Sequence, residues 1–154
     1  MELSLLLNPS NVAVGVDASD KESLIHAVID LIENHEAVVD ADAMRSAVLE
    51  REATMSTGVG KGLALPHAKT AAVTDVVAAL AVSEQPVEFA SIDNEPVQIV
   101  FLLLGRQDAK SQHVRILSRI SRMMNREETR KAVLEAATPE ALLQVVVEAE
   151  SHLN

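Results

Sequence analysis

A continuously apolar run at residues 98–104 constrains the fold more than any other part of this chain. The run reads QIVFLLL and is closed by Gly105. Its length and its lack of polar alternation are typical of a strand that is buried on both faces. Such a strand needs helices on both sides of its sheet. We therefore predict an α/β fold in which residues 98–104 form a covered strand.

Hydrophobic periodicity and turn residues predict the elements around this strand. Further strands are expected at residues 62–66 and 75–83, with a weaker one at 12–16. The predicted helices cover residues 21–35, 40–52, 111–124, one beginning at Asn125, and one beginning at Pro139. Asp20, Asp40 and Thr138 are the expected N-caps, and Asn125 with Glu128 resembles a capping box. No internal repeat or linker interrupts the pattern, so one domain over residues 1–154 is predicted.

Composition excludes several classes of function. The chain has two Phe and no Tyr or Trp, so it lacks a stacking platform for bases or sugar rings, which argues against single-stranded nucleic acid binding and lectin activity. It has no Cys and therefore no disulfide, thiol nucleophile or thiolate metal site. Without a basic leader or a long apolar run, we expect a cytoplasmic protein that does not insert into a membrane. A net charge of −10 means that any phosphate chemistry needs local cations.

The glycine-rich segment 56–62, STGVGKG, does not satisfy the two familiar phosphate-binding patterns. A Walker A loop requires Gly and Ser or Thr where this chain has Met55 and Gly62. A dinucleotide fingerprint requires Gly where Leu63 stands, and it should follow a strand rather than a helix. Taken alone, the segment can also be a flexible turn between a helix and a strand.

The longer run at residues 51–67 carries a more specific pattern. It consists of an Arg51–Glu52 pair, a Ser-Thr-Gly-Val-Gly turn, a short apolar strand and the pair Pro66–His67. This run resembles the active-site signature of the fructose/mannitol-type enzyme IIA family of the bacterial sugar phosphotransferase system. His113 in SQHVRIL resembles the family's second histidine, and residues 92–97 also look like the family. The resemblance covers nearly the whole chain, and Ala68 is a mild departure where Gly is commoner.

The resemblance implies a mixed sheet of about five strands flanked by helices. It also implies that His67 is phosphorylated on Nε2 as a phosphohistidine intermediate. The phosphate would come from the histidine-containing phosphocarrier protein and leave to an enzyme IIB domain. The expected phosphotransferase component needs no cofactor or metal, and the sugar cannot be read from it.

The residue types suit phosphoryl transfer, which depends mainly on positioning and charge stabilisation. A neutral imidazole can attack with one nitrogen while the other stays protonated, so His67 is the expected nucleophile. Arg51 has the fork geometry for phosphate oxygens, with Glu52 expected to orient it. His113 falls on the apolar face of its helix, near the N-terminus, where an anion is favoured. The remaining expected support of the phosphate site comes from Ser56, Thr57 and Gly58.

Several alternatives stay open at this level. His67 and His113 could be a metal pair, although no third ligand is apparent. Arg115, Arg119, Arg122 and Arg126 lie on the helix face opposite His113, as a solvated stripe or a docking surface. The chain could also be a regulatory module similar to the nitrogen-related enzyme IIA proteins, whose phosphorylation state controls binding to target proteins. A binding module that has lost the chemistry is a third reading.

Overall fold

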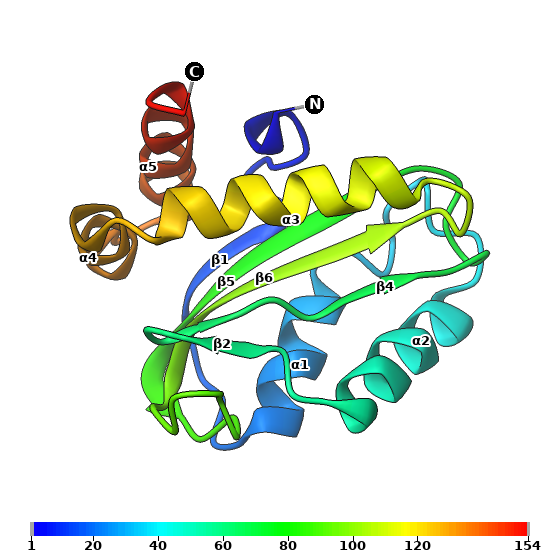
Figure 1. The fold of residues 1–154 in the computed structure, drawn as a ribbon, viewed down its shortest axis with the longest axis horizontal. Coiled ribbons are helices and arrows are strands. Elements are labelled where there is room, and N and C mark those ends of the chain that lie inside the picture. Colours follow the sequence, from blue (N-terminus) through cyan, green and yellow to red (C-terminus); the bar gives the residue numbers. More distant parts are fainter. Residues whose placement is uncertain (1, 154) are drawn as a thin grey trace.

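The computed structural model describes residues 2–153, and they form a six-stranded mixed sheet with helices on both faces (Figure 1). The strand order is β1-β5-β6-β3-β2, and β4 also pairs with β6. In chain order the elements are the 3-10 turn η1 Leu3–Leu5, β1 Val12–Val16, α1 Lys21–Asp30, α2 Ala41–Thr54, β2 Gly58–Gly60, β3 Leu63–Ala64, β4 His67–Lys69, β5 Val77–Val87, β6 Val97–Gly105, α3 Lys110–Met124, α4 Glu127–Glu135 and α5 Pro139–Ser151.

The central strand of the sheet is β6, which runs antiparallel to β5 and parallel to β3 and β4. All its residues are buried except the half-buried Gln98. Its side chains alternate between two apolar clusters, with Leu102 and Leu104 packed beside α1 and α2, and Phe101 and Leu103 packed beside α3, α4 and α5. Figure 1 shows α3 along one face of the sheet and α1 with α2 on the other. The predicted strand with two buried faces is confirmed.

One edge of the sheet differs from the prediction at a proline. Residues 62–66 were expected to form one strand ending before His67, but the strand is broken into β3 and β4, and His67 is the first residue of β4. Pro66 has no N–H to contribute to a ladder. Its carbonyl still accepts the N–H of Leu103 at 3.0 Å, so both pieces stay aligned along β6. This break explains why the sheet has six strands rather than about five.

The predicted N-caps are confirmed for three helices. Asp20, Asp40 and Thr138 each accept the backbone N–H of the residue three positions further on. Pro139 begins α5 as expected. The first helix is shorter than predicted, since α1 ends at Asp30 and residues 31–34 are turns. Within residues 2–153, every helix is too short or too polar to pass through a bilayer.

The capping box predicted at Asn125 is wrong. Helix α4 begins at Glu127, and its N-cap, Arg126, makes no capping side-chain bond. The Asn125 side chain instead accepts a hydrogen bond from Lys61 Nζ at 2.5 Å. The Glu128 carboxylate pairs with Arg126 at 2.7 Å. The side chains of Asn125 and Glu128, which were expected to cap this helix together, therefore have other partners.

One arginine of the predicted stripe, Arg119, is not simply solvated. Its Nε lies 3.1 Å from Glu150, whose side chain is 3% exposed. The same carboxylate accepts the backbone N–H groups of Leu3 and Ser4 at 2.6 and 2.8 Å. Burial alone would raise the pKa of Glu150, but the donors from Ser4, Leu3 and Arg119 outweigh it and hold the pKa below its usual value. The N-terminal turn is thereby fastened to α5.

Candidate functional site

His67 is held in one tautomer by the backbone beside it. Its Nδ1 lies 2.6 Å from the carbonyl oxygen of Leu65. A carbonyl oxygen only accepts, so Nδ1 must carry the proton in this hydrogen bond. The lone pair is then on Nε2, on the other side of a half-buried ring. This is the protonation pattern that the predicted nucleophile requires.

His113 faces His67 from the first turn of α3. The two ring centroids are 5.5 Å apart and the rings are inclined at 51°. His113 is only 6% exposed, yet neither ring nitrogen has a hydrogen-bond partner within the described chain. Buried polar atoms normally have hydrogen-bond partners, and the N–H of this ring is not used by any residue between 2 and 153. An acceptor anion beside His67 would supply such a partner.

Burial determines the charge state of His113. Exclusion of water is the largest cause that lowers its pKa from 6.5 to about 4, and the electrostatic contributions of the neighbouring His67 and Lys69 act in the same direction. The ring is therefore neutral near pH 7. A neutral imidazole carries one N–H, which can donate a hydrogen bond to an anion.

This lowered pKa predicts a dependence of stability on pH. The unfolded chain binds a proton on His113 near pH 6.5, and the folded chain only near pH 4. The contribution of His113 to the free energy of unfolding should therefore be fully present above about pH 6.5. It should be lost as the pH falls toward 4, which lowers the free energy of unfolding by about 3 kcal/mol. Urea unfolding between pH 7 and pH 4, with His113→Leu as the matched control, measures this contribution. A pH dependence that is the same in both proteins would contradict it.

Gly105 makes room for His113. A Cβ at this position would lie 2.8 Å from His113 Nδ1, closer than real side chains allow. Gly105 ends β6, and its carbonyl accepts the N–H of Thr70 at 2.9 Å, so the backbone cannot move away freely. The sequence marks Gly105 only as a turn residue, and nothing in the pattern reveals this contact.

Replacing Gly105 with alanine should therefore displace the His113 ring. We expect a loss of about 1–3 kcal/mol in the free energy of unfolding, the usual range for overpacking. Phosphate acceptance should fall as well, because His113 no longer faces His67. Thermal unfolding and the rate of phosphorylation measure the two effects. Full activity in a folded Gly105→Ala protein would show that the position of His113 is not important.

Arg51 reaches the same region from the end of α2. One of its terminal nitrogens donates to the Met55 carbonyl at 2.9 Å, which uses only one of its five N–H donors. Arg51 and His67 line one hollow of about 600 Å³ at the surface. Its walls are mainly apolar, with Met55 68% exposed and Ile92 83% exposed at its margin. The hollow offers a cation beside the candidate nucleophile.

Glu52 does not take the role expected for it. Its carboxylate accepts the N–H and the hydroxyl of Thr57 at 2.9 and 2.5 Å and pairs with Lys21 at 2.8 Å. These contacts direct it into the turn and α1 rather than toward Arg51. A carboxylate one residue after an arginine on a helix points about 100° away from it. Glu52 is thus a support of the turn.

Two backbone N–H groups of the Ser-Thr-Gly segment, those of Thr57 and Gly58, already have side-chain acceptors. The Gly58 N–H donates to the Ser56 hydroxyl at 3.1 Å, and that hydroxyl donates to the Phe89 carbonyl at 2.8 Å. Gly58 is required because a Cβ there would overlap Ser91. Ser91 was not anticipated from the sequence. Ser56, Thr57 and Gly58 line the hollow, and their support of a phosphate stays a prediction.

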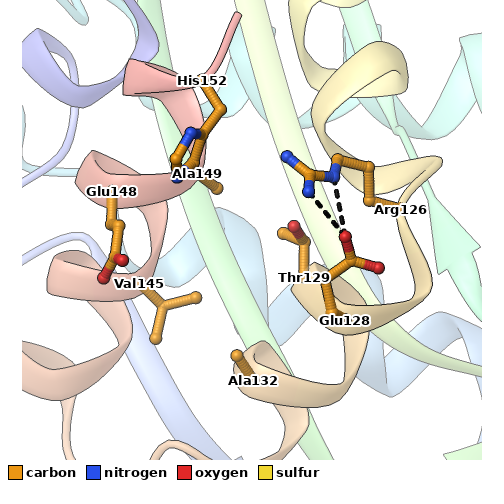
Figure 2. A pocket seen from close by; sticks show the side chains of 8 residues that line it. All are labelled: Arg126, Glu128, Thr129, Ala132, Val145, Glu148, Ala149 and His152. Atoms are coloured by element: carbon orange, nitrogen blue, oxygen red, sulfur yellow. Dashed lines mark hydrogen bonds and ion pairs between the residues drawn. The ribbon is translucent and has the colours of Figure 1, made fainter.

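A second hollow lies between α4 and α5, away from the two histidines. Figure 2 shows Arg126 directed at Glu128 at the start of α4, with Glu148 and His152 on the α5 side of the hollow. It measures about 200 Å³. The Arg126 charge is paired with Glu128 at 2.7 Å, so this hollow presents no free cation of the kind that Arg51 offers. Among residues 2–153, no three His, Cys, Asp or Glu side chains gather as a metal site would require.

Comparison with known proteins identifies the family to which this chain belongs. Residues 5–149 match the model of the family described as phosphoenolpyruvate-dependent sugar phosphotransferase system, EIIA 2. The chain belongs to this type-2 EIIA family. Its named relatives fall into two groups, sugar-specific components of the phosphotransferase system and nitrogen regulatory proteins.

The curated relatives include a fructose-specific EIIA component from Haloferax volcanii, 37% identical over 128 residues and covering 83% of each chain. The fructose-specific EIIABC component of Bacillus subtilis is 33% identical over 146 residues, which are 95% of this chain but only 23% of that protein. This chain thus spans about a quarter of that relative. A nitrogen regulatory protein from Pseudomonas aeruginosa is 29% identical over 151 residues, 98% of both chains.

Solved structures support the fold assignment. The nitrogen regulatory protein IIA-Ntr from Neisseria meningitidis superposes with a TM-score of 0.87 at 24% identity, covering 94% of this chain and 98% of that one. The mannitol IIA domain in complex with phosphorylated IIB from Escherichia coli has a TM-score of 0.78 at 17% identity, covering 92% and 97%. The predicted class, a mixed α/β fold of the EIIA type, is confirmed.

Proposed function

We propose that this protein is a phosphoryl carrier of the phosphoenolpyruvate-dependent sugar phosphotransferase system, with residues 1–154 forming one type-2 EIIA domain that works in the cytoplasm. The observation that carries the proposal is the pair His67 and His113. One ring has a defined Nε2 lone pair, and the other is buried 5.5 Å away with both nitrogens unpartnered in the described chain.

The transfer needs only residues that the site already contains. His67 Nε2 attacks the phosphorus of a phosphohistidine on the donor, the histidine-containing phosphocarrier protein. The new N–P bond forms as the donor's N–P bond breaks, and the donor ring, protonated on its other nitrogen, keeps that electron pair and leaves as neutral imidazole. The Leu65 carbonyl holds the Nδ1 proton throughout. His113 and Arg51 then hydrogen-bond the phosphoryl oxygens, which stabilises the negative charge.

The direct test is phosphorylation with purified components. The protein is incubated with phosphoenolpyruvate, enzyme I and the phosphocarrier protein, and its intact mass is measured. One acid-labile phosphoryl group is expected, and none when the phosphocarrier protein is omitted. An unmodified mass, while a known EIIA domain is phosphorylated in parallel, would instead favour the binding-module function.

A regulatory role is the second candidate, since the Pseudomonas aeruginosa nitrogen regulatory protein matches over 98% of both chains. In that case phosphorylation of His67 controls binding to a target protein instead of feeding an enzyme IIB domain. The two roles differ in how the phosphate leaves. Rapid discharge on addition of a fructose-type IIB domain supports transport, whereas a stable phosphoprotein whose target binding changes supports regulation.

A further inference from the structure

Lys21, the first residue of α1, is connected to the site by a chain of short contacts. Its Nζ lies 2.8 Å from Glu52 Oε1, with the Glu52 side chain 5% exposed and that of Lys21 29% exposed. The same ammonium lies 4.8 Å from the centroid of the Phe89 ring. Lys21 therefore provides the positive charge that pairs with the buried carboxylate of Glu52. It does so from α1, a helix that contributes no other residue to the site.

From Glu52 the contacts continue to the active-site turn. The carboxylate accepts both donors of Thr57, and Thr57 is 3% exposed. The Phe89 residue under Lys21 also accepts the Ser56 hydroxyl through its carbonyl at 2.8 Å. Lys21 consequently secures the turn at two adjacent residues.

From the turn the contacts reach the imidazole itself. The Leu65 N–H donates to the Thr57 carbonyl at 3.0 Å, and the Leu65 carbonyl accepts the His67 Nδ1 proton at 2.6 Å. The result is an uninterrupted series from Lys21 through Glu52, Thr57 and Leu65 to His67. Each member contacts the next, and the Leu65 carbonyl keeps the proton of His67 on Nδ1.

We propose that Lys21 is a positioning residue for phosphoryl transfer, acting through Glu52 and Thr57 to keep the proton of His67 on Nδ1 and its lone pair on Nε2. The proposal rests on the proposed function of His67. Without the Lys21 charge, Glu52 is a buried carboxylate lacking its cation, which favours turning toward water. Thr57 then loses its acceptor, and the Leu65 carbonyl is no longer held against Nδ1.

The test compares Lys21→Met with the wild-type protein. Methionine keeps the length and the contact with Phe89 but removes the charge. Lys21→Arg is the conservative variant, and Lys131→Met, an exposed lysine on α4, is the matched control. The initial rate of phosphorylation should fall roughly ten-fold in Lys21→Met, the scale typical of groups that orient an active residue. Arginine should restore most of the rate, and Lys131→Met should equal the wild type.

The second readout is the ¹⁵N spectrum of the His67 ring in the unphosphorylated proteins. Wild-type protein should show the Nδ1–H form, and Lys21→Met a mixture with the Nε2–H form. This measurement needs no phosphate donor, so it separates the two proposals. Failure of the wild type to accept phosphate would overturn the carrier function, while the spectrum would still test the action of Lys21. Wild-type rate and tautomer in Lys21→Met would overturn the role of Lys21.

A double variant keeps the test informative if Lys21→Met does not fold. Lys21→Met with Glu52→Gln leaves no uncompensated charge, and the amide oxygen can still accept one Thr57 donor. Partial recovery of the rate and of the Nδ1–H form supports the route through Glu52. A folded double variant that has wholly lost the Nδ1–H form would overturn that route.

Discussion

Replacing His67 with glutamine is expected to abolish phosphate acceptance while the fold is retained. The amide of glutamine offers no nucleophilic lone pair, so no covalent intermediate can form. It can still donate to the Leu65 carbonyl, which His67 contacts at 2.6 Å. His67 is half-buried, so the free energy of unfolding should change by about 1 kcal/mol or less. Intact mass after incubation with the phosphorylating components measures the first effect, and thermal unfolding the second.

The matched control for this substitution is His152→Gln. His152 is exposed at the end of α5 and belongs to the hollow between α4 and α5 (Figure 2). This control should accept one phosphoryl group at the wild-type rate. A phosphorylated His67→Gln protein would place the modification on another residue and overturn the assignment.

Replacing His113 with leucine should have opposite effects on activity and stability. The rate of phosphorylation should fall by about two orders of magnitude, because a preorganised donor beside the developing charge is lost. Stability at pH 7 should rise by about 1 kcal/mol, because two buried nitrogens without partners in residues 2–153 are replaced by apolar atoms of similar volume.

Single-turnover phosphorylation and urea unfolding test this pair of effects. His113→Gln, which restores a donor in the same space, should recover part of the rate without the gain in stability. A leucine variant that accepts phosphate at the wild-type rate would show that His113 is only a core residue. A leucine variant that is less stable would show that its ring nitrogens have partners after all.

Most elements of the fold could be predicted because they depend on local chemistry. The strand β6 followed from an uninterrupted apolar run, and the caps Asp20, Asp40 and Thr138 followed from residues whose side chains reach backbone three positions away. The prediction failed at Asn125, where a side chain from a distant part of the sequence, Lys61, takes the capping group. Local patterns cannot anticipate such a competitor.

The candidate site was predictable for a different reason. Arg51, His67 and His113 were named from a sequence pattern, and the structure places His67 beside His113 and in the same hollow as Arg51. The pattern did not reveal Gly105, which stands alone in the sequence but lies against the His113 ring. Nor did it reveal Lys21, whose partner Glu52 is 31 positions away.

The sequence by itself determined most of the strands and helices, and which side chains have the chemistry to carry a phosphate. Only the tertiary structure decided the protonation states of the two histidines, His67 and His113. The proton of His67 is on Nδ1 because a carbonyl two residues away is aimed at it. The neutral state of His113 comes from burial between α3 and the end of β6. The tautomer depends on the backbone path through Pro66, and the pKa depends on exclusion of water by segments remote in sequence, so both are set only in the folded chain.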